Sequence, residues 1–103
     1  SGQGPSAKNK YGHPAVYISA YNGHAGAVSA LARLGADLDA TESWGMTALM
    51  IAAGNGQVEC ARALLAGGAD RTLRATGGEW EGKTALQIAE MNGKAEVAAL
   101  LRE

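Results

Sequence analysis

The sequence predicts an all-α solenoid of stacked helix-turn-helix units joined by hairpin-like loops. A segment that opens with Gly and closes eleven positions later with Asn-Gly occurs three times. The copies begin at Gly12, Gly45 and Gly82, so their spacing is 33 and then 37 residues. Each repeat, which runs from one such segment to the next, holds two short apolar patterns of helical period. Phe is absent and Ala is abundant, which predicts a core of many small contacts between stacked helices.

Composition excludes several classes of protein. The formal net charge is −1 and the basic residues are scattered, so we expect neither nucleic acid nor a membrane surface as partner. No apolar run approaches the roughly 20 residues that span a bilayer. The single cysteine, Cys60, excludes an intramolecular disulfide framework and favours an intracellular location, cytoplasmic or nuclear.

The chain divides into two parts. Residues 1–10 are polar and small, and they are interpreted as a flexible leader or a remnant of expression. Residues 11–103 form the repeat domain, with repeats at about 11–43, 44–80 and 81–103. We expect a monomer or a part of a larger chain.

The first repeat predicts helices over about 14–21 and 24–34. Pro14 suits a first helical position, because it needs no intrahelical hydrogen bond there and presets φ. Asn22-Gly23 ends the first helix, since Gly adopts the left-handed conformation without a Cβ penalty. Val28 and Leu31 give the second helix its apolar face.

The second repeat predicts helices over 47–54 and about 58–66. The Thr47 side chain can accept a hydrogen bond from a free backbone N–H at the helix start. Asn55-Gly56 ends that helix, and Gly67-Gly68 ends its partner.

The third repeat predicts helices over about 84–91 and 94–102, with Asn92-Gly93 as the stop between them. A longer connector, 71–81, precedes it. Within this connector, residues 76–79 account for the four-residue excess over the 33-residue period.

The second copy also carries the clearest signature. It reads Gly45-x-Thr47-Ala48-Leu49-x-x-Ala52-Ala53-x-x-Gly56, then Leu64-Leu65-x-x-Gly68-Ala69-Asp70. This pattern resembles the ankyrin repeat, whose period is 33 residues, and the resemblance covers about residues 11–103. It implies a module that binds protein or peptide partners through hairpin tips and the concave face of the first helices.

The sequence departs from that family at three kinds of position. Pro14 stands where the family has Thr, and Thr47 and Thr84 are followed by Ala rather than Pro. Tyr17, Met50 and Gln87 replace the family's His, which in ankyrin repeats helps to hydrogen-bond neighbouring repeats. Burial of Ala and Leu is therefore expected to carry more of the stability.

No constellation for catalysis is evident. His13, His24 and Cys60 are widely separated, and none stands at metal-ligand spacing with another. Asp37, Asp39 and Glu42 are more typical of a solvated hairpin than of a metal site. We expect no enzyme, metal or cofactor.

Three aromatic residues stand at the predicted hairpin tips: Tyr11, Trp44 and Trp80. An exposed ring at a tip favours a partner, because tips are usually polar. The alternative is that each ring folds back onto the neighbouring hairpin.

A second candidate set lies on the first-helix faces. Its members are His13, Tyr17 and Tyr21; Met46, Met50 and Asn55; and Lys83, Gln87 and Met91. Tyr and Met are amphipathic or adaptable and suit peptide binding. Tyr17, Tyr21 and Met46 are expected at the surface, Lys83 at the rim, and Met50 more often between repeats.

The connector 71–81 combines Arg71 and Arg74 with Glu79 and Glu81. It either extends the binding face or is an idle insertion. The preferred hypothesis for the whole chain is partner binding. The alternatives are a structural spacer within a larger array, which predicts that the tip tryptophans are buried by flanking repeats or domains, and a small-ligand or catalytic site, which predicts a deep pocket.

Overall fold

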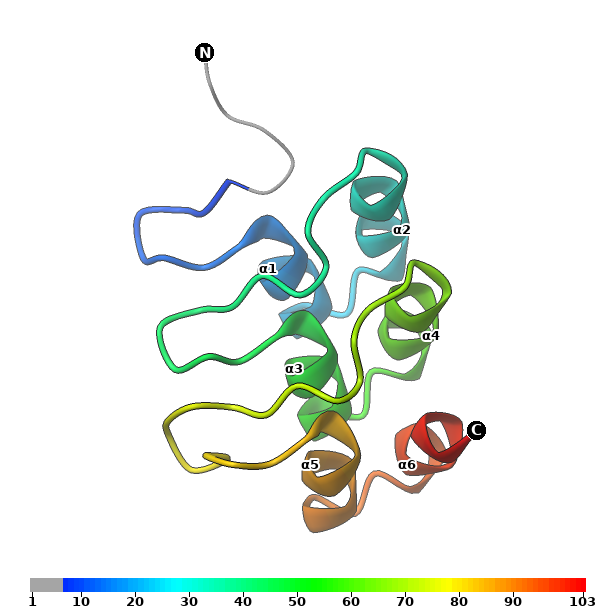
Figure 1. Cartoon of the computed structure of the whole chain (residues 1–103). Helices are drawn as coiled ribbons and strands as arrows, with labels where there is room; N and C mark the ends of the chain where they lie inside the picture. The colour runs from blue at the N-terminus through cyan, green and yellow to red at the C-terminus, as the bar shows by residue number, and fades with distance from the viewer. Residues whose placement is uncertain (1–6) are drawn as a thin grey trace.

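The computed structural model describes residues 7–103 and shows six α-helices in two rows (Figure 1). The helices are α1 (Ala15–Tyr21), α2 (Ala25–Arg33), α3 (Ala48–Asn55), α4 (Val58–Ala66), α5 (Ala85–Met91) and α6 (Ala95–Arg102). The first helices of the repeats, α1, α3 and α5, stack as one row, and α2, α4 and α6 stack as the other. The predicted all-α solenoid is confirmed. Among the described residues, no helix combines the length and apolar character needed to cross a bilayer.

Helix boundaries follow the predicted signals closely. Pro14 is the N-cap of α1 rather than its first residue, with φ −63° and ψ 149°. The third helix runs through Asn55, one residue beyond the predicted end, and Gly56 ends it at φ 69°. Glycine fits there because this left-handed conformation strains any residue with a Cβ.

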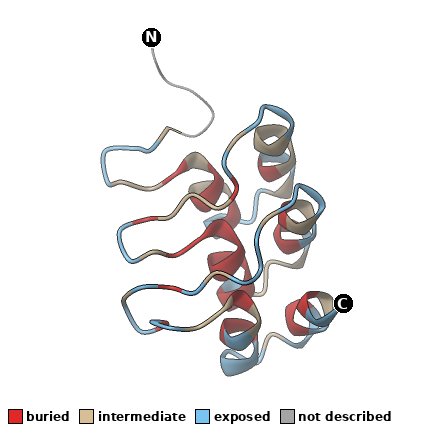
Figure 2. Ribbon diagram, in the orientation of Figure 1, coloured by how far each residue is buried: buried red, intermediate tan, exposed pale blue. Residues whose placement is uncertain are grey.

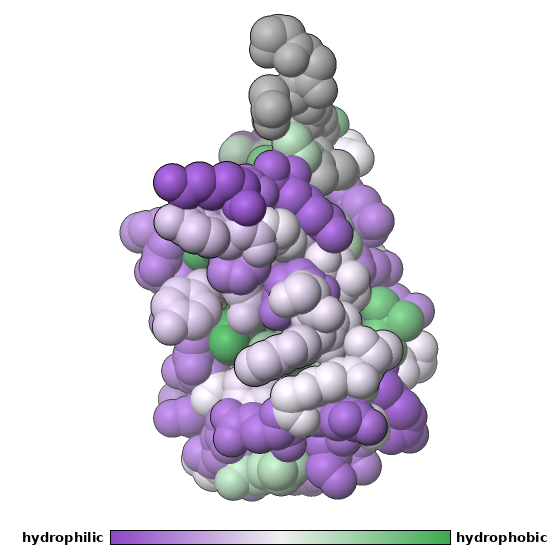
Figure 3. Space-filling view, turned by 90° about the vertical axis from the view of Figure 1, so that its left-hand side faces the viewer, coloured by the Kyte–Doolittle hydropathy of each residue, from purple (hydrophilic) through white to green (hydrophobic). Residues whose placement is uncertain are grey.

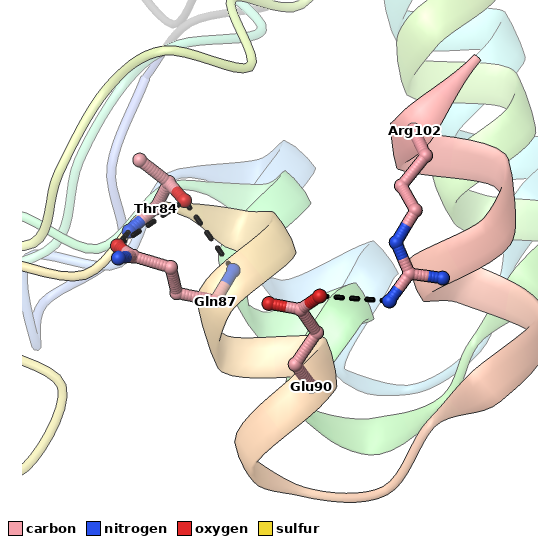
Figure 4. A network of polar contacts seen from close by, with 4 residues as sticks. All are labelled: Thr84, Gln87, Glu90 and Arg102. Carbon is pink, nitrogen blue, oxygen red and sulfur yellow. Dashed lines mark hydrogen bonds and ion pairs between the residues drawn. The ribbon is translucent and has the colours of Figure 1, made fainter.

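Thr47 and Thr84 start the helices α3 and α5 through reciprocal capping. The Oγ1 atom of Thr84 accepts from the backbone N–H of Gln87 at 3.3 Å, and the Gln87 Oε1 atom accepts from the Thr84 N–H at 3.0 Å (Figure 4). At α3, the Met50 sulfur takes the place of the amide oxygen and lies 3.4 Å from the Thr47 nitrogen. The Met50 and Gln87 side chains stand where the family has His, and each supplies a hydrogen-bond acceptor to the backbone at the start of its own helix.

The core lies between the two helix rows and is continuous through all three repeats (Figure 2). The central helix α3 is buried from Ala48 to Gly54. The larger of the fully buried side chains are Leu49, Met50, Leu64, Ile88, Val16, Val28 and Val97. Of the nine buried alanines among the described residues, seven lie in α3, α5 and their partner helices α4 and α6, so the expected core of small, close contacts is present.

Hydrogen bonds also link neighbouring repeats. The Asp39 Oδ1 atom accepts from the backbone N–H of Asp70 at 2.8 Å. The Asn92 side chain donates to the Gly54 carbonyl at 3.0 Å. The Arg71 Nη1 atom donates to the carbonyls of Leu101 and Glu103, so it caps the C-terminal end of α6.

Candidate functional site

The first two hairpin loops, here called fingers, are built by the same device. In the first finger, the Asn9 Oδ1 atom accepts from the backbone N–H groups of Tyr11 and His13 at 2.9 and 3.0 Å. In the second, the Glu42 Oε1 atom accepts from Trp44 and Met46 at 2.8 and 2.9 Å. A side chain three positions before the finger glycine therefore fixes each turn, and it fixes the aromatic residue at the tip.

The first finger begins earlier than the sequence predicts. Lys8 pairs with Pro14 in an isolated antiparallel bridge, so residues 8–10 belong to this finger and not to the leader that we assigned to residues 1–10. Residues 1–6 of the proposed leader lie outside the described residues.

The third finger carries the predicted four-residue excess. Its base matches that of the second finger, because the Ala75 and Lys83 backbones pair at 3.1 Å as Glu42 and Met46 do. The extra residues 76–79 extend toward the second finger, where the N–H groups of Thr76 and Gly77 both donate to the Trp44 carbonyl at 3.0 Å. The insertion thus ties two fingers together.

The three tip aromatics have different environments. Tyr11 is 67% exposed and Trp44 is 58% exposed. The Trp44 ring lies over the insertion: a Cβ atom on Gly78 would stand 2.7 Å from its Cε3 atom. Both alternatives for a tip ring therefore hold for Trp44: it folds back onto the neighbouring finger, and it still presents a large apolar surface.

Trp80 does not join that exposed set. It is only 9% exposed, and its ring occupies the space beside Gly54 at the end of α3. The expectation that Trp80 is available at a tip is wrong. The physical reason is that the extra residues shift it one place from the tip position, and Gly54 offers a socket without a side chain.

A row of aromatic rings runs along the first repeat. We call Tyr11, His13, Tyr17 and Tyr21 the aromatic row. Their successive ring centroids lie 6.4, 5.4 and 6.4 Å apart. Tyr21 is 55% exposed at one end and Tyr11 is exposed at the other, whereas His13 is half-buried. The row is a chain of ring contacts from the finger tip to the end of α1, and its surface is exposed at the two ends.

Two other predicted contact residues are less accessible than the sequence suggested. Tyr17 and Met46 are buried, so the expectation that they lie at the surface is wrong. Burial raises the pKa of the Tyr17 phenol, and the nearby Glu42 carboxylate and Tyr21 add to the rise. Met50 is fully buried, as the packing alternative for it predicted, and Lys83 is half-buried.

The finger surface viewed from its tips is of intermediate hydropathy in the middle, with strongly hydrophilic side chains above and below (Figure 3). Toward the third repeat, the face becomes polar. Gln87 and Glu90 are exposed there, and Glu90 forms an ion pair with Arg102 at 2.7 Å (Figure 4). Exposed apolar rings are thus concentrated on the first two repeats.

The described residues do not suggest catalytic chemistry. Within residues 7–103, no three His, Cys, Asp or Glu side chains come close enough to hold a metal ion. Cys60 is buried in α4. Burial raises the pKa of its thiol and Glu59 raises it further, which disfavours the nucleophilic thiolate.

Two functional features were missed by reasoning from the sequence. The roles of Asn9 and Glu42 as finger organisers follow from side-chain geometry, although their shared place three residues before a finger Gly is a signal that could have been used. The socket at Gly54 also had a signal, because the equivalent residues in the other repeats, Tyr21 and Met91, are large.

The paired helices, the ordered fingers and the exposed rings define a helical-repeat scaffold with a preformed surface. The chain belongs to the ankyrin repeat family: the family's three-copy profile matches residues 1–75 and 18–103. Ankyrin repeats are generally protein–protein interaction modules, and domains of this kind are typically non-enzymatic.

Proposed function

We propose that this chain binds a protein or peptide partner through its finger tips and the face of its first helices. The observation that carries the proposal is the exposure of Tyr11, Tyr21 and Trp44 on one scaffold. Large aromatic side chains are frequent anchors in protein interfaces, because they bury much area and have few rotamers to lose.

Rigidity supports the same conclusion. Trp44 is fixed through its own N–H by Glu42 and through its carbonyl by Thr76 and Gly77. A surface that is ordered before binding loses little conformational entropy when the partner arrives. The aromatic row gains order from its successive ring contacts.

Burial changes the set of proposed contacts. Tyr11, His13, Tyr21 and Trp44 are the direct candidates, and Lys83 is a candidate at the polar rim. The buried candidates Tyr17, Met46, Met50 and Trp80 support these residues from beneath, so their replacement is proposed to act through shape.

A random peptide library displayed on phage tests the proposal. The native domain is compared with Tyr21→Ser/Trp44→Ser and with Leu34→Ser, whose parent side chain is 70% exposed at the end of α2. We expect enriched peptides to bind the native domain and the Leu34 variant, and to lose most of their affinity for the double variant. Equal binding to all three folded proteins, or no enriched peptide, contradicts the proposal.

A structural spacer within a larger array is the second candidate, and one observation favours it. Gly23 is covered by Gln57 and Gly56 by Lys94, each from the next repeat, whereas Gly93 has no such neighbour within 4 Å. Beside Gly93 lies an open depression of about 360 Å³ that Ala89 and Ala98 help to line. A further repeat would fit this face, and an unproductive phage selection favours this role.

A further inference from the structure

Acidic residues are unevenly distributed along the chain. Lys and Arg occur in all three repeats, whereas the ten Asp and Glu residues all lie within residues 37–103. The first finger and the helices α1 and α2 that follow it contain Lys8, Lys10 and Arg33 and no carboxylate side chain. This end of the domain is therefore basic, although the formal net charge of the whole chain is −1.

The organising residue of the first finger adds no negative charge to it. Each of the first two fingers uses a side-chain oxygen to accept from two backbone N–H groups, but the residue is Asn9 in the first finger and Glu42 in the second. An amide oxygen accepts such bonds while it stays neutral. Lys8 and Lys10 are exposed, and within residues 7–103 neither ammonium group forms an ion pair. The first finger thus presents two cations without a counter-ion.

The carboxylates that follow in the sequence are directed elsewhere. Asp37 accepts from the Asp39 N–H at 3.0 Å, and Asp39 accepts from the Asp70 N–H of the next repeat at 2.8 Å. Glu42 is buried and bonded to the backbone of its own finger. The tip of the second finger, residues 43–45, is uncharged, and the third finger lies beyond it (Figure 1). The cations of the first finger therefore keep their positive field at the surface.

The exposed groups of this finger suit a carboxylate. The Lys10 ammonium lies 5.3 Å from the centroid of the exposed Tyr11 ring, within the range of a cation–π interaction. An ammonium group and a phenol both donate hydrogen bonds to carboxylate oxygens. The Tyr11 ring also offers apolar contact area beside the charge. The finger tip thus combines hydrogen-bond donors for an acidic group with a surface for its apolar neighbours.

We propose that the first finger and the exposed ends of the aromatic row bind an acidic peptide segment, whose Asp or Glu side chains pair with Lys8 and Lys10. This inference rests on the proposed function and specifies its partner. A basic segment would meet like charges at this finger, so charge complementarity selects the acidic one. A short segment is favoured over a nucleic acid, because the domain as a whole is net negative and repels an extended polyanion.

The direct test uses a short peptide of Gly, Ser and Leu with glutamate at every third position, and the same peptide with lysine at those positions. Binding is followed by two-dimensional NMR through the backbone amide signals of the domain. We expect the glutamate peptide to shift the signals of residues 8–11 and to leave those of α6 unchanged, and the lysine peptide to shift neither. No shift in the first finger with the glutamate peptide, or equal shifts with both peptides, overturns the inference.

Two further titrations examine the other possible occupants. A single-stranded oligothymidylate with the same number of negative charges should bind more weakly than the glutamate peptide. Tighter binding of the oligothymidylate would assign the surface to nucleic acid and overturn the inference. Dilution of the domain alone should leave the signals of the first finger unchanged, whereas shifts that depend on its concentration would identify a second copy as the occupant and also overturn it.

Charge variants make the test specific to the site. Lys8→Gln/Lys10→Gln should weaken glutamate-peptide binding by roughly threefold to tenfold, the range expected for two exposed ion pairs. Arg33→Gln/Arg62→Gln changes the net charge equally at exposed positions of α2 and α4 and should leave binding unchanged. Equal weakening in both double variants indicates an unspecific charge effect and overturns the inference.

A third variant adds a charge while it keeps the turn. In Asn9→Asp, the carboxylate can still accept from the Tyr11 and His13 N–H groups, as Glu42 does in the second finger. The amide signals of the finger should confirm that the turn is retained, and glutamate-peptide binding should weaken by roughly threefold. Unchanged affinity in this folded variant contradicts the inference.

The phage selection separates this inference from the function on which it rests. Peptides that depend on Tyr21 and Trp44 and are rich in Asp or Glu support both proposals. Peptides that depend on these rings without enrichment in acidic residues leave the binding function intact and overturn the inference. Failure to enrich any peptide that depends on them counts against both.

Discussion

The indole ring of Trp80 occupies the space that a side chain at Gly54 would need. A Cβ atom on Gly54 would overlap the Cη2 atom of Trp80. In the repeat alignment, Gly54 stands where the first repeat has Tyr21 and the third has Met91. The long finger and the helix of the preceding repeat are thus fitted to each other.

Replacement of Gly54 should expose this fit. Alanine normally stabilises a helix relative to glycine by roughly 0.5–1 kcal/mol. In Gly54→Ala, displacement of the Trp80 indole should destabilise the domain by more than this gain, since overpacking a core costs about 1–3 kcal/mol. We expect a net loss of about 1 kcal/mol in the free energy of unfolding, measured by urea denaturation.

The same replacement in a Trp80→Ala background should have the opposite sign. Trp80→Ala alone should cost about 3 kcal/mol, because a large buried ring is lost. With the ring gone, Gly54→Ala should stabilise the domain by about 0.5 kcal/mol. A destabilising effect of similar size in both backgrounds would show that the two residues are not coupled.

The contact between Trp44 and the insertion is tested by two glycines. Gly78 and Gly82 both have positive φ, 74° and 78°, so Ala at either position should cost about 1–2 kcal/mol. Only Gly78 lies against Trp44, whereas a Cβ on Gly82 would meet nothing within 4 Å. Gly78→Ala should therefore be the more destabilising by about 1 kcal/mol and should alone shift the Trp44 indole N–H signal. Identical effects would contradict the proposed packing.

The two helix caps should differ in strength. Thr47 is buried and Thr84 is half-buried. Thr47→Ala leaves the Met50 N–H without its acceptor in the core, so it should cost about 2 kcal/mol. Thr84→Ala should cost about 1 kcal/mol, because water can reach the Gln87 N–H. Serine variants keep the hydroxyl and should recover most of the loss at both sites in thermal unfolding.

Arg71 should hold the end of the last helix in place. Its loss in Arg71→Ala frees the Leu101 and Glu103 carbonyls, so amide hydrogen exchange in the last turn of α6 should become about fivefold faster. Arg74→Ala removes the same charge from the third finger and should leave exchange in α6 unchanged. Equal acceleration by both variants would indicate a general loss of stability.

Alkaline pH should destabilise the fold through Cys60. Burial raises the pKa of its thiol above the ordinary value of 9.0. As the pH rises past 9.0, the unfolded chain releases this proton while the folded chain retains it, so the free energy of unfolding falls until the folded pKa is reached. Cys60→Ala should flatten this decline in thermal unfolding. An unchanged slope would assign the decline to other groups, such as Tyr17, whose raised pKa acts from about 10.0.

The helices and their order could be predicted from sequence because their signals are local. Asn-Gly stops, threonine caps and apolar spacing act within one repeat and recur three times. The side-chain positions of Trp80 and Met46 could not be predicted in this way. Both positions depend on contacts across repeats or on the exact course of a finger. Trp80 stands only one place away from the tip position in the sequence, yet its ring packs beside Gly54 instead of lying at the tip.

The candidate site was therefore only partly predictable. Tyr11, Tyr21 and Trp44 are exposed, although the Trp44 ring also rests on the neighbouring finger. The contacts of Arg71 and Arg74 were not predictable from composition, because they depend on where the chain directs the two guanidinium groups. Only the folded chain shows that Arg71 reaches the end of α6, whereas Arg74 contacts Gly82 at the base of its own finger.

The hydrogen bonds between the insertion and the Trp44 carbonyl also have an evolutionary consequence. Residues 76–79 supply two donors to that carbonyl and a glycine surface for the ring. A lineage that lost these four residues would return to the 33-residue period, yet it would leave Trp44 without its support and move Trp80 away from Gly54. Removal of the insertion should therefore preserve the fold only if Trp44 and Trp80, which depend on it for their packing, are replaced as well.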